Sequence, residues 1–412
     1  MTGSAASPVP IPVRVGVHPG PALLAGVADG PSLPAHRARY GDLPTPTLDE
    51  LHRLVSAVGL RGRGGAAFPF ATKLEAAARG RRPVVVVNLS EGEPASAKDS
   101  ALALSAPHLV LDGAVATARA LGAREVHLVL PGDRPMARLR MLAAVDERHD
   151  KVRLRTHTAD PRFVAGQARA VVELMSGRTN LPVTAWAPEA VEGYRRRPTL
   201  LSNAETWAQV GRLVLAGEPA YRRLGTGAEP GTTLLTHSRH GADPEVREVP
   251  FGTSFGDVLP PLPAGAAVLV GGFHGAWTTW GLLAGTPVSV PGMAAAGLPL
   301  GAGIVHVPAT AGCPLGFTSA VVDYLAGQSA GRCGPCVNGL PALADAVRAA
   351  WQGRDTAARV DELAGLLTRR GACAHPDGTV RMVRSLFTAL PAEVAAHRDG
   401  ACVATTRAGV AP

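Results

Sequence analysis

The chain has 412 residues, enough for two or three domains; 46% of them are hydrophobic and 18% are charged. This balance excludes an intrinsically disordered protein, which needs low hydrophobicity and high charge. The formal net charge is +8. The arginines are scattered and form no block of like charges, so we expect no nucleic-acid binding.

The sequence predicts neither a membrane span nor a secretory signal. Residues 258–322 carry no Asp, Glu, Lys or Arg, but Pro and Gly interrupt them throughout, so no span of about 20 apolar residues forms. Residues 1–12 lack the basic start and apolar core of a signal peptide. We therefore expect a cytoplasmic protein, whose five cysteines are better explained as thiols, redox groups or metal ligands than as disulfides.

The first half of the chain predicts an α/β domain. Residues 1–47, rich in Pro, Gly and Ala, are expected to form an irregular arm, and the domain is expected to cover 48–228. Within it, 84–87 is a β-branched run typical of a strand buried on both faces, 106–122 is typical of a helix, and 125–130 of a second strand. A βαβ unit in a Rossmann-like parallel sheet is the simplest arrangement.

The second half predicts two smaller parts. Residues 229–310 hold short strand-like runs between Gly and Pro turns, at 232–238, 246–249 and 267–270, and are expected to form a small β module. Residues 311–400 show four segments with apolar residues at helical spacing, which predicts a helical bundle. Residues 401–412 are expected to form a flexible tail.

Two polar segments are candidates for a binding site. Arg61 to Pro69 is rich in glycine, whose backbone can approach a ligand closely, and Lys73 supplies the charge that a phosphate needs. Asn88 to Asp99 directly follows the strand at 84–87, and ligands of open parallel sheets bind beyond the carboxyl ends of strands. An ordinary glycine-rich loop and a solvated acidic loop are the alternatives.

The cysteines suggest a metal or redox site. Cys333 and Cys336 have the spacing of a metal-binding or thioredoxin-like pair, and Cys373 offers a third soft ligand. Such a set suits an iron–sulfur cluster or, with His375, a zinc ion. Structural buried cysteines are the alternative. Cys313 and Cys402 have no partner at such spacing and are interpreted as plain thiols.

In this order, the segments resemble the NADH-binding flavoprotein subunit of respiratory NADH:quinone oxidoreductase and the related diaphorase subunits. Arg61 to Pro69 is similar to that family's Arg-Gly-Arg-Gly-Gly-Ala-Gly-Phe-Pro loop, and Asn88 to Asp99 to its Asn-Ala-Asp-Glu-x-Glu-Pro stretch. Pro198 to Thr206 is similar to its Pro-Thr-x-x-Asn-Asn-Val-Glu-Thr segment. Pro230 to Thr253 resembles the start of its β-grasp module, and Ser329 to Gly339 its cluster motif Ser-Cys-Gly-x-Cys-x-Pro-Cys-x-x-Gly.

The resemblance implies an enzyme that uses FMN to accept a hydride from NADH and passes electrons singly through an iron–sulfur cluster to a ferredoxin-like or 2Fe–2S protein. It also implies a role for each matching residue. Those expected to bind FMN or the dinucleotide are Arg63, Gly64, Gly65, Ala66, Phe68, Lys73, Asn88, Glu91, Glu93, Ser202 and Asn203. Phe68 would stack on the dinucleotide and Glu93 would contact its ribose. Cys333, Cys336 and Cys373 would bind the cluster.

This sequence departs from the family pattern at several of these positions. Ala330 stands where the family has its first cluster cysteine, so the expected cluster is a 4Fe–4S completed by another ligand or a 3Fe–4S. Gln167 and Ala168 replace a pair of glutamates near the flavin, which predicts a higher flavin potential. Ala67 replaces a glycine, and Phe70 replaces a threonine and adds bulk near the nucleotide.

Two other functions fit the same departures. A degenerate paralogue would keep the fold as a scaffold or cofactor-binding module without turnover. A zinc-stapled or thiol protein would carry no flavin at all.

Overall fold

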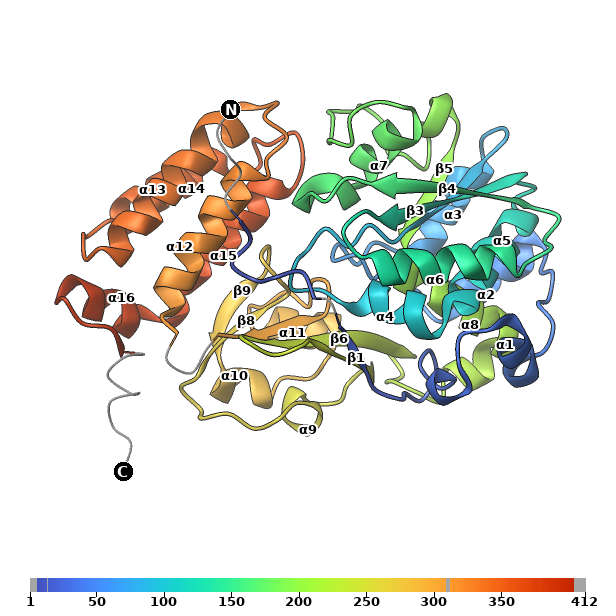
Figure 1. Ribbon diagram of the computed structural model, residues 1–412, viewed down its shortest axis with the longest axis horizontal. Coiled ribbons are helices and arrows are strands. Elements are labelled where there is room, and N and C mark those ends of the chain that lie inside the picture. Colours follow the sequence, from blue (N-terminus) through green and yellow to red (C-terminus); the bar gives the residue numbers. More distant parts are fainter. Residues whose placement is uncertain (1–5, 13, 309–311, 404–412) are drawn as a thin grey trace.

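The computed structural model describes residues 6–12, 14–308 and 312–403. Figure 1 shows an α/β domain, a second sheet below it, and a helical bundle on the side away from the α/β helices. The predicted fold class is therefore confirmed. Most of the predicted tail at 401–412 lies outside the described residues.

The α/β domain is built on a parallel sheet in the order β4-β3-β2-β5. Its strands are β2 (Val84–Asn88), β3 (Glu125–Pro131), β4 (Arg153–Ala159) and β5 (Thr199–Asn203). Its helices are α2 (Leu48–Ala57), α3 (Phe70–Ala78), α4 (Lys98–Ser105), α5 (Pro107–Ala120), α6 (Pro135–Asp146), α7 (Ala168–Met175) and α8 (Ala204–Tyr221). The β-branched run of β2 is fully buried, as expected of a central parallel strand.

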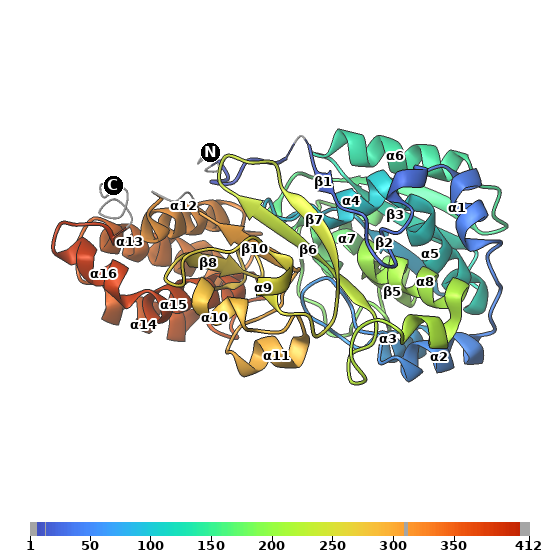
Figure 2. The same cartoon turned by 90° about the horizontal axis from the view of Figure 1, so that it is seen from below.

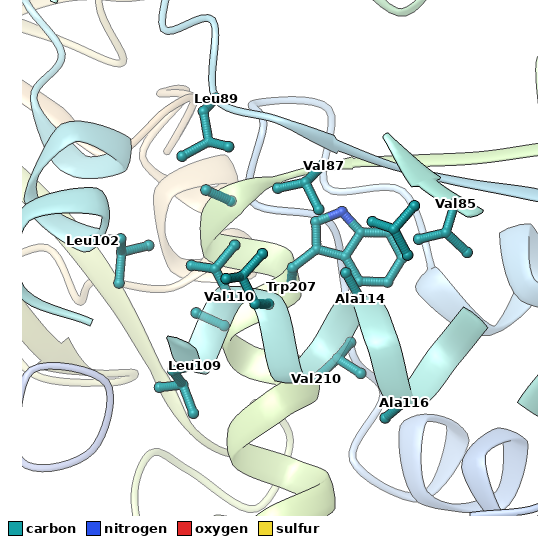
Figure 3. Close-up of a cluster of buried hydrophobic side chains, with 14 of the residues drawn as sticks. Val85, Val87, Leu89, Leu102, Leu109, Val110, Ala114, Ala116, Trp207 and Val210 are labelled. Atoms are coloured by element: carbon teal, nitrogen blue, oxygen red, sulfur yellow. The ribbon is translucent and has the colours of Figure 1, made fainter. Parts of the chain in front are cut away.

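Trp207 of α8 anchors the core of this domain (Figure 3). Its indole N–H lies 3.0 Å from the carbonyl oxygens of both Val86 and Ser202, on neighbouring strands. Helices α5 and α8 approach closely because Gly113 has no side chain: a Cβ there would lie 1.9 Å from the Trp207 carbonyl oxygen. The carboxyl ends of β2 and β5 are thereby held at one edge of the sheet, where the candidate site forms.

The second sheet has the order β1-β7-β6-β10-β8-β9. Its strands are β1 (Gly16–Val17), β6 (Thr232–Arg239), β7 (Glu245–Pro250), β8 (Ala267–Val270), β9 (Ala276–Thr279) and β10 (Ile304–Val307). Short helices connect them: α9 (Phe255–Val258), α10 (Trp280–Ala284) and α11 (Val290–Ala295). The last strand, β10, returns between the hairpin and β8 and runs parallel to β6, which is the arrangement of the expected β-grasp sheet.

The N-terminal arm is more ordered than the sequence predicted. Within 1–47, β1 extends the second sheet beside β7, and α1 (Leu33–Tyr40) packs on the α/β domain. Arg37 and His36 bind the buried carboxylate of Asp112 at 2.8–3.0 Å. The carboxylate of Glu248 accepts three consecutive N–H groups of the arm, from Ala22 to Leu24. These buried polar contacts, distant in the sequence, give the arm its structure.

The bundle contains the four predicted helices and a further one. Its helices are α12 (Pro314–Gly327), α13 (Leu340–Trp351), α14 (Ala357–Leu367), α15 (His375–Ala389) and α16 (Pro391–Arg398). The π-helical turn Pro335–Gly339 leads into α13. Figure 2, like Figure 1, shows α16 at the end of the bundle farthest from the α/β domain. In the described part of the chain no helix taken singly could cross a membrane by length and hydropathy, although α4 and α5 pass that test as a bent pair.

Candidate functional site

A cavity of about 600 Å³ lies where the three parts of the molecule meet. The α/β domain contributes the glycine-rich loop and the ends of β2 and β5, the β-grasp module contributes residues such as Gly301, and the bundle contributes Ala374 and Arg381. Of the predicted binding residues, the cavity is lined by Gly64, Gly65, Ala66, Phe68, Lys73, Asn88, Glu93, Ser202 and Asn203. Segments far apart in the sequence thus form one site of the size typical for small ligands and cofactors.

The glycine-rich loop folds back on itself at the mouth of the cavity. The N–H of Gly62 donates to the Phe68 carbonyl oxygen at 2.8 Å, which closes the loop. Gly65 has φ +100°, and a Cβ there would meet the Gly301 backbone at 3.7 Å. The ring of Phe68 is 46% exposed, as a ring that stacks on an incoming ligand must be. Ala67, which stands in place of a glycine, has φ +47°, a conformation that costs alanine free energy.

Phe70 lies differently from the sequence expectation. Its side chain is only 1% exposed and packs edge-on against Trp207, with the ring centroids 5.5 Å apart. Although Phe70 borders the cavity, most of its ring packs in the core of the α/β domain.

The polar side chains of the cavity are held by the sheet edge. Lys73 lies 3.1 Å from the carbonyl oxygen of Leu201 and 3.4 Å from the carboxylate of Glu189. Asn88, at the end of β2, donates to the Gly166 carbonyl oxygen at 2.7 Å. Asn203, at the end of β5, accepts from the N–H of Thr206 and so begins α8. Each group is oriented before any ligand arrives, which lowers the entropic cost of binding.

Glu93 is a titratable group of this cavity whose pKa lies near neutrality. Burial raises its pKa to about 7, although the N–H groups of Phe273 and Ala95 and the charge of Arg134 act in the opposite direction. The Phe273 N–H lies 2.8 Å from its carboxylate. Phe273 belongs to the β-grasp module, so Glu93 also joins that module to the α/β domain.

Two predicted residues have side chains outside the lining of this cavity. The guanidinium of Arg63 lies 4.5 Å from the ring centroid of Phe251 and faces a smaller cavity of about 230 Å³ on the other side of the loop. The carboxylate of Glu91 accepts the N–H groups of Asp99 and Ser100 at 3.0 Å each and so caps the start of α4. Both side chains support the loops that line the larger cavity.

Lys98, the lysine of the segment Asn88 to Asp99, is a structural residue. It lies 2.8 Å from the carboxylate of Glu205 and 3.3 Å from that of Asp99. Although burial lowers the pKa of Lys98, these carboxylates raise it above its usual range. Glu205 also accepts from Thr233 and Leu234 of β6. The ion pair therefore joins α4, α8 and the β-grasp sheet.

The bundle brings the three predicted cluster cysteines together beside the cavity. The pKa of the Cys336 thiol is raised to about 12 by burial, by a hydrogen bond to Cys333 and by proximity to Cys373, while the N–H of Ala330 lowers it. The N–H of Ala330 therefore reaches the Cys336 sulfur, and only a methyl group stands where the family has a further ligand. Three neighbouring sulfurs with N–H donors suit an iron–sulfur cluster, whose sulfur ligands are typically hydrogen-bonded.

His375 has other partners in this structure. Its two ring nitrogens lie 3.0 Å from His274 and 2.8 Å from the Leu325 carbonyl oxygen. Burial lowers its pKa to about 4, so it is neutral at pH 7. The Cys₃His zinc site considered from the sequence would have to break both contacts. The motif also lies in a helical bundle, away from the βαβ context of a thioredoxin.

Gln167 connects the cavity to the cysteines. Its side chain lines the cavity and donates a hydrogen bond to Cys373. Burial raises the pKa of that thiol, and the N–H of His375 and the side chain of Gln167 offset part of the rise. The ring of Phe163, one turn earlier, also lines the cavity and packs against His274 and Phe273, with centroids 4.6 and 6.3 Å away. Sequence reasoning missed Phe163 and His274, because neither lies in a recognisable motif.

Cys313 and Cys402, interpreted from the sequence as plain thiols, lie close to each other's side-chain partners in the structure. Both sulfurs lie beside the carboxylate of Glu393, and the Cys313 sulfur also lies beside His397. The sequence spacing did not reveal this, because 89 positions separate the two cysteines along the chain.

These features define a cofactor-binding α/β domain joined to a bundle with metal ligands. Residues 55–212 match the Nuo51 FMN-binding domain, and residues 316–397 match the NADH-ubiquinone oxidoreductase-F iron-sulfur binding region. The chain therefore belongs to the family of NADH-oxidising flavoprotein subunits that contain these two regions.

Curated relatives match along most of the chain. An NADH-quinone oxidoreductase subunit of Rhizobium meliloti is 28% identical over 88% of this chain and 92% of its own length. NADP-reducing hydrogenase subunit HndC of Solidesulfovibrio fructosivorans is 27% identical over 78% of this chain and 70% of its own. A crystal structure of NAD+-reducing NiFe hydrogenase in the air-oxidized state superposes with a TM-score of 0.81 at 25% identity, covering 93% of this chain and 68% of that one.

Proposed function

We propose that this chain catalyses the FMN-dependent oxidation of NADH and delivers the electrons one at a time to an iron–sulfur cluster in the bundle. When bound, FMN would supply the chemistry: it takes a hydride from NADH and releases two electrons singly. The chain's own residues bind and orient the two nucleotides, exclude water and hold the cluster.

The observation that carries this proposal is the position of Gln167. One side chain both lines the cavity and donates to a cluster cysteine, Cys373. A flavin in the cavity and a cluster on the cysteines would therefore both lie beside this side chain. Such proximity suits electron transfer between the two groups.

The cavity offers a complementary group for each end of FMN. Lys73 supplies a positive charge, and the N–H groups around Gly64 and Gly65 can approach a phosphate because no Cβ intervenes. Asn88, Ser202 and Asn203 present hydrogen-bonding groups at the carboxyl ends of β2 and β5 for the ribityl chain and the ring. Arg63 and Glu91 would act indirectly, by holding the loops in place.

NADH would enter past Phe68, which is exposed at the mouth of the cavity. The ring can stack on a nicotinamide or an adenine and shield the hydride donor from water. Glu93 lies deeper and can accept hydrogen bonds from ribose hydroxyl groups when it is ionised.

Cys333, Cys336 and Cys373 would bind the cluster through three thiolates, as a 4Fe–4S cluster with one further non-cysteine ligand or as a 3Fe–4S cluster. A carrier is then needed to take the electrons onward, and a ferredoxin-like or 2Fe–2S protein is the proposed partner. The cytoplasmic location stays a prediction.

Anaerobic purification of the full chain tests the proposal. We expect FMN, iron and sulfide in the protein, bleaching of the flavin by NADH, and a cluster signal in electron paramagnetic resonance after NADH addition. Cys333→Ala should lose the cluster signal but keep flavin bleaching, whereas Cys402→Ala should keep both.

Other outcomes would contradict the proposal in distinct ways. Bound flavin that NADH does not reduce would indicate the non-catalytic paralogue. A colourless protein with zinc on the three cysteines would indicate a zinc-stapled protein. Equal loss of the cluster signal in Cys333→Ala and Cys402→Ala would overturn the ligand assignment.

A further inference from the structure

A second group of metal-ligating side chains lies at the far end of the bundle. Cys313 precedes α12, Glu393 and His397 are one turn apart on α16, and Cys402 follows α16. One ligand atom from each of the four lies within 4.8 Å of all the others, and Glu393 is buried. We propose that these residues form a structural zinc site that fastens the end of the chain to the start of the bundle.

The distances suit one small cation. The Cys313 sulfur lies 3.3 Å from Glu393 Oε1 and 3.1 Å from His397 Nε2, His397 Nε2 lies 3.2 Å from the same Oε1, and the Cys402 sulfur lies 3.1 Å from it. In a tetrahedral zinc site with ordinary bond lengths, neighbouring ligand atoms are about 3.3–3.8 Å apart. The remaining pairs lie within 4.8 Å, so small side-chain adjustments would bring all four atoms to coordination distance.

The outer contacts orient two of these ligands toward a common point. His397 Nδ1 lies 2.9 Å from the Trp351 carbonyl oxygen, so Nδ1 carries the proton and the lone pair of Nε2 faces the Cys313 sulfur. A metal-binding histidine commonly makes such a bond with its second nitrogen. The N–H of Gly316, in the first turn of α12, donates to the Cys313 sulfur at 3.1 Å and holds it beside Glu393 and His397.

The chemistry of these four side chains favours zinc over other metal ions. Two sulfurs, an imidazole and a carboxylate are the donor types of zinc sites in proteins, and four protein ligands leave no open position for catalysis. The negative charge of two thiolates and a carboxylate would be largely neutralised by a divalent cation. Without one, two weak S–H donors share a single buried carboxylate oxygen.

This site is separate from the proposed cluster. Helix α13 begins just after Cys336 and ends at Trp351, whose carbonyl oxygen holds His397. The helix has 12 residues, so about 18 Å separates its ends. The zinc would join residues 313 and 402 and so close a loop that contains the whole bundle, which should stabilise it.

Metal analysis of the full chain, purified with FMN and iron quantified in parallel, tests the proposal. We expect about one zinc per chain in the unmodified protein, and at least about tenfold less in Cys402→Ser and in His397→Ala. The matched control is Cys333→Ala, which should lose iron but keep its zinc. Unchanged zinc in Cys402→Ser, or equal zinc loss in Cys333→Ala, would overturn the assignment.

A titration covers the case in which a ligand variant folds poorly. Co²⁺ added to zinc-depleted Cys333→Ala chain should produce a thiolate-to-cobalt absorption band and raise the temperature of bundle unfolding, and Zn²⁺ should remove the band. No band would overturn the proposal. A Cys313–Cys402 disulfide in anaerobically purified chain, detected by mass spectrometry without thiol alkylation, would show instead that the pair is a redox couple.

Discussion

The two ends of the proposed electron path tolerate departures from the family pattern differently. In the cavity, Ser202 replaces an asparagine and can still hydrogen-bond at the same sheet edge. At the cysteines, Ala330 replaces a thiolate with a methyl group, and only its N–H reaches Cys336. Many contacts share the binding of a nucleotide, so a replacement that keeps a hydrogen-bonding group, such as serine for asparagine, costs little. A cluster depends on a few strong bonds, so one replacement changes the site.

The largest expected effect tests the cavity. Lys73→Met removes its lysine cation while retaining the apolar stem, and should weaken FMN binding by roughly 10–100-fold, because a hydrogen bond to a charged group contributes about 1.5–3 kcal/mol. Fluorescence titration of deflavinated chain measures this. Lys151→Met, in the turn before β4, is the matched control and should bind FMN normally. If Lys73→Met bound FMN as tightly as the unmodified chain, Lys73 would not be the residue that binds the phosphate.

The next prediction tests the cluster end. Ala330→Cys should supply a fourth thiolate and slow the loss of iron to a chelator by about tenfold. Iron release followed by absorbance under anaerobic conditions measures the rate. Ala342→Cys in α13 adds a thiol elsewhere in the bundle and should have no effect. Unchanged iron release in Ala330→Cys would show that the cluster does not lie beside Ala330.

A third prediction concerns the boundary between the two ends. Gln167→Glu introduces a negative charge into the cavity wall, which should lower the flavin potential by tens of millivolts, because a reduced, anionic flavin is then harder to form. Ala168→Glu should act in the same direction without touching the Cys373 contact. A spectroelectrochemical titration measures both, and equal potentials in all three chains would contradict the expected influence of the missing carboxylates.

The pH dependence of NADH binding tests Glu93. Burial raises the pKa of Glu93 to about 7. Above pH 7 the carboxylate is ionised and accepts strong hydrogen bonds from the ribose hydroxyl groups, whereas below pH 7 it is protonated. The KM for NADH should therefore rise by about 3–10-fold from pH 8 to pH 6. In Glu93→Gln the KM should be high and independent of pH. If the KM for NADH changed equally with pH in both proteins, the titrating group would be one other than Glu93.

The smallest expected effect concerns the glycine-rich loop. Ala67 has φ +47°, so Ala67→Gly should stabilise the α/β domain by up to about 1 kcal/mol, because the relief of left-handed strain exceeds the entropy that glycine loses on folding. Thermal unfolding followed by calorimetry measures it. Ala66→Gly, at a position without positive φ, should be neutral or destabilising. A less stable Ala67→Gly chain would contradict this account of the loop.

Much of the fold could be predicted from local patterns. The β-branched run of β2 and the apolar spacing of α12 to α15 identified buried elements, because hydrophobic periodicity directly reflects burial. The order of the N-terminal arm could not be predicted, since it depends on Asp112 and Glu248, which are distant in the sequence. Likewise, α16 was missed because its eight residues carry little apolar periodicity.

The sequence by itself determined the three parts of the chain, the motifs of the cavity and the cysteines at 333, 336 and 373. Only the tertiary structure decided which side chains share the cavity wall, how Gln167 reaches Cys373, and that Cys313 and Cys402 meet at α16. Motifs report residues that act within a short stretch of chain. Contacts between distant segments arise from packing of the whole fold, and no local pattern encodes them.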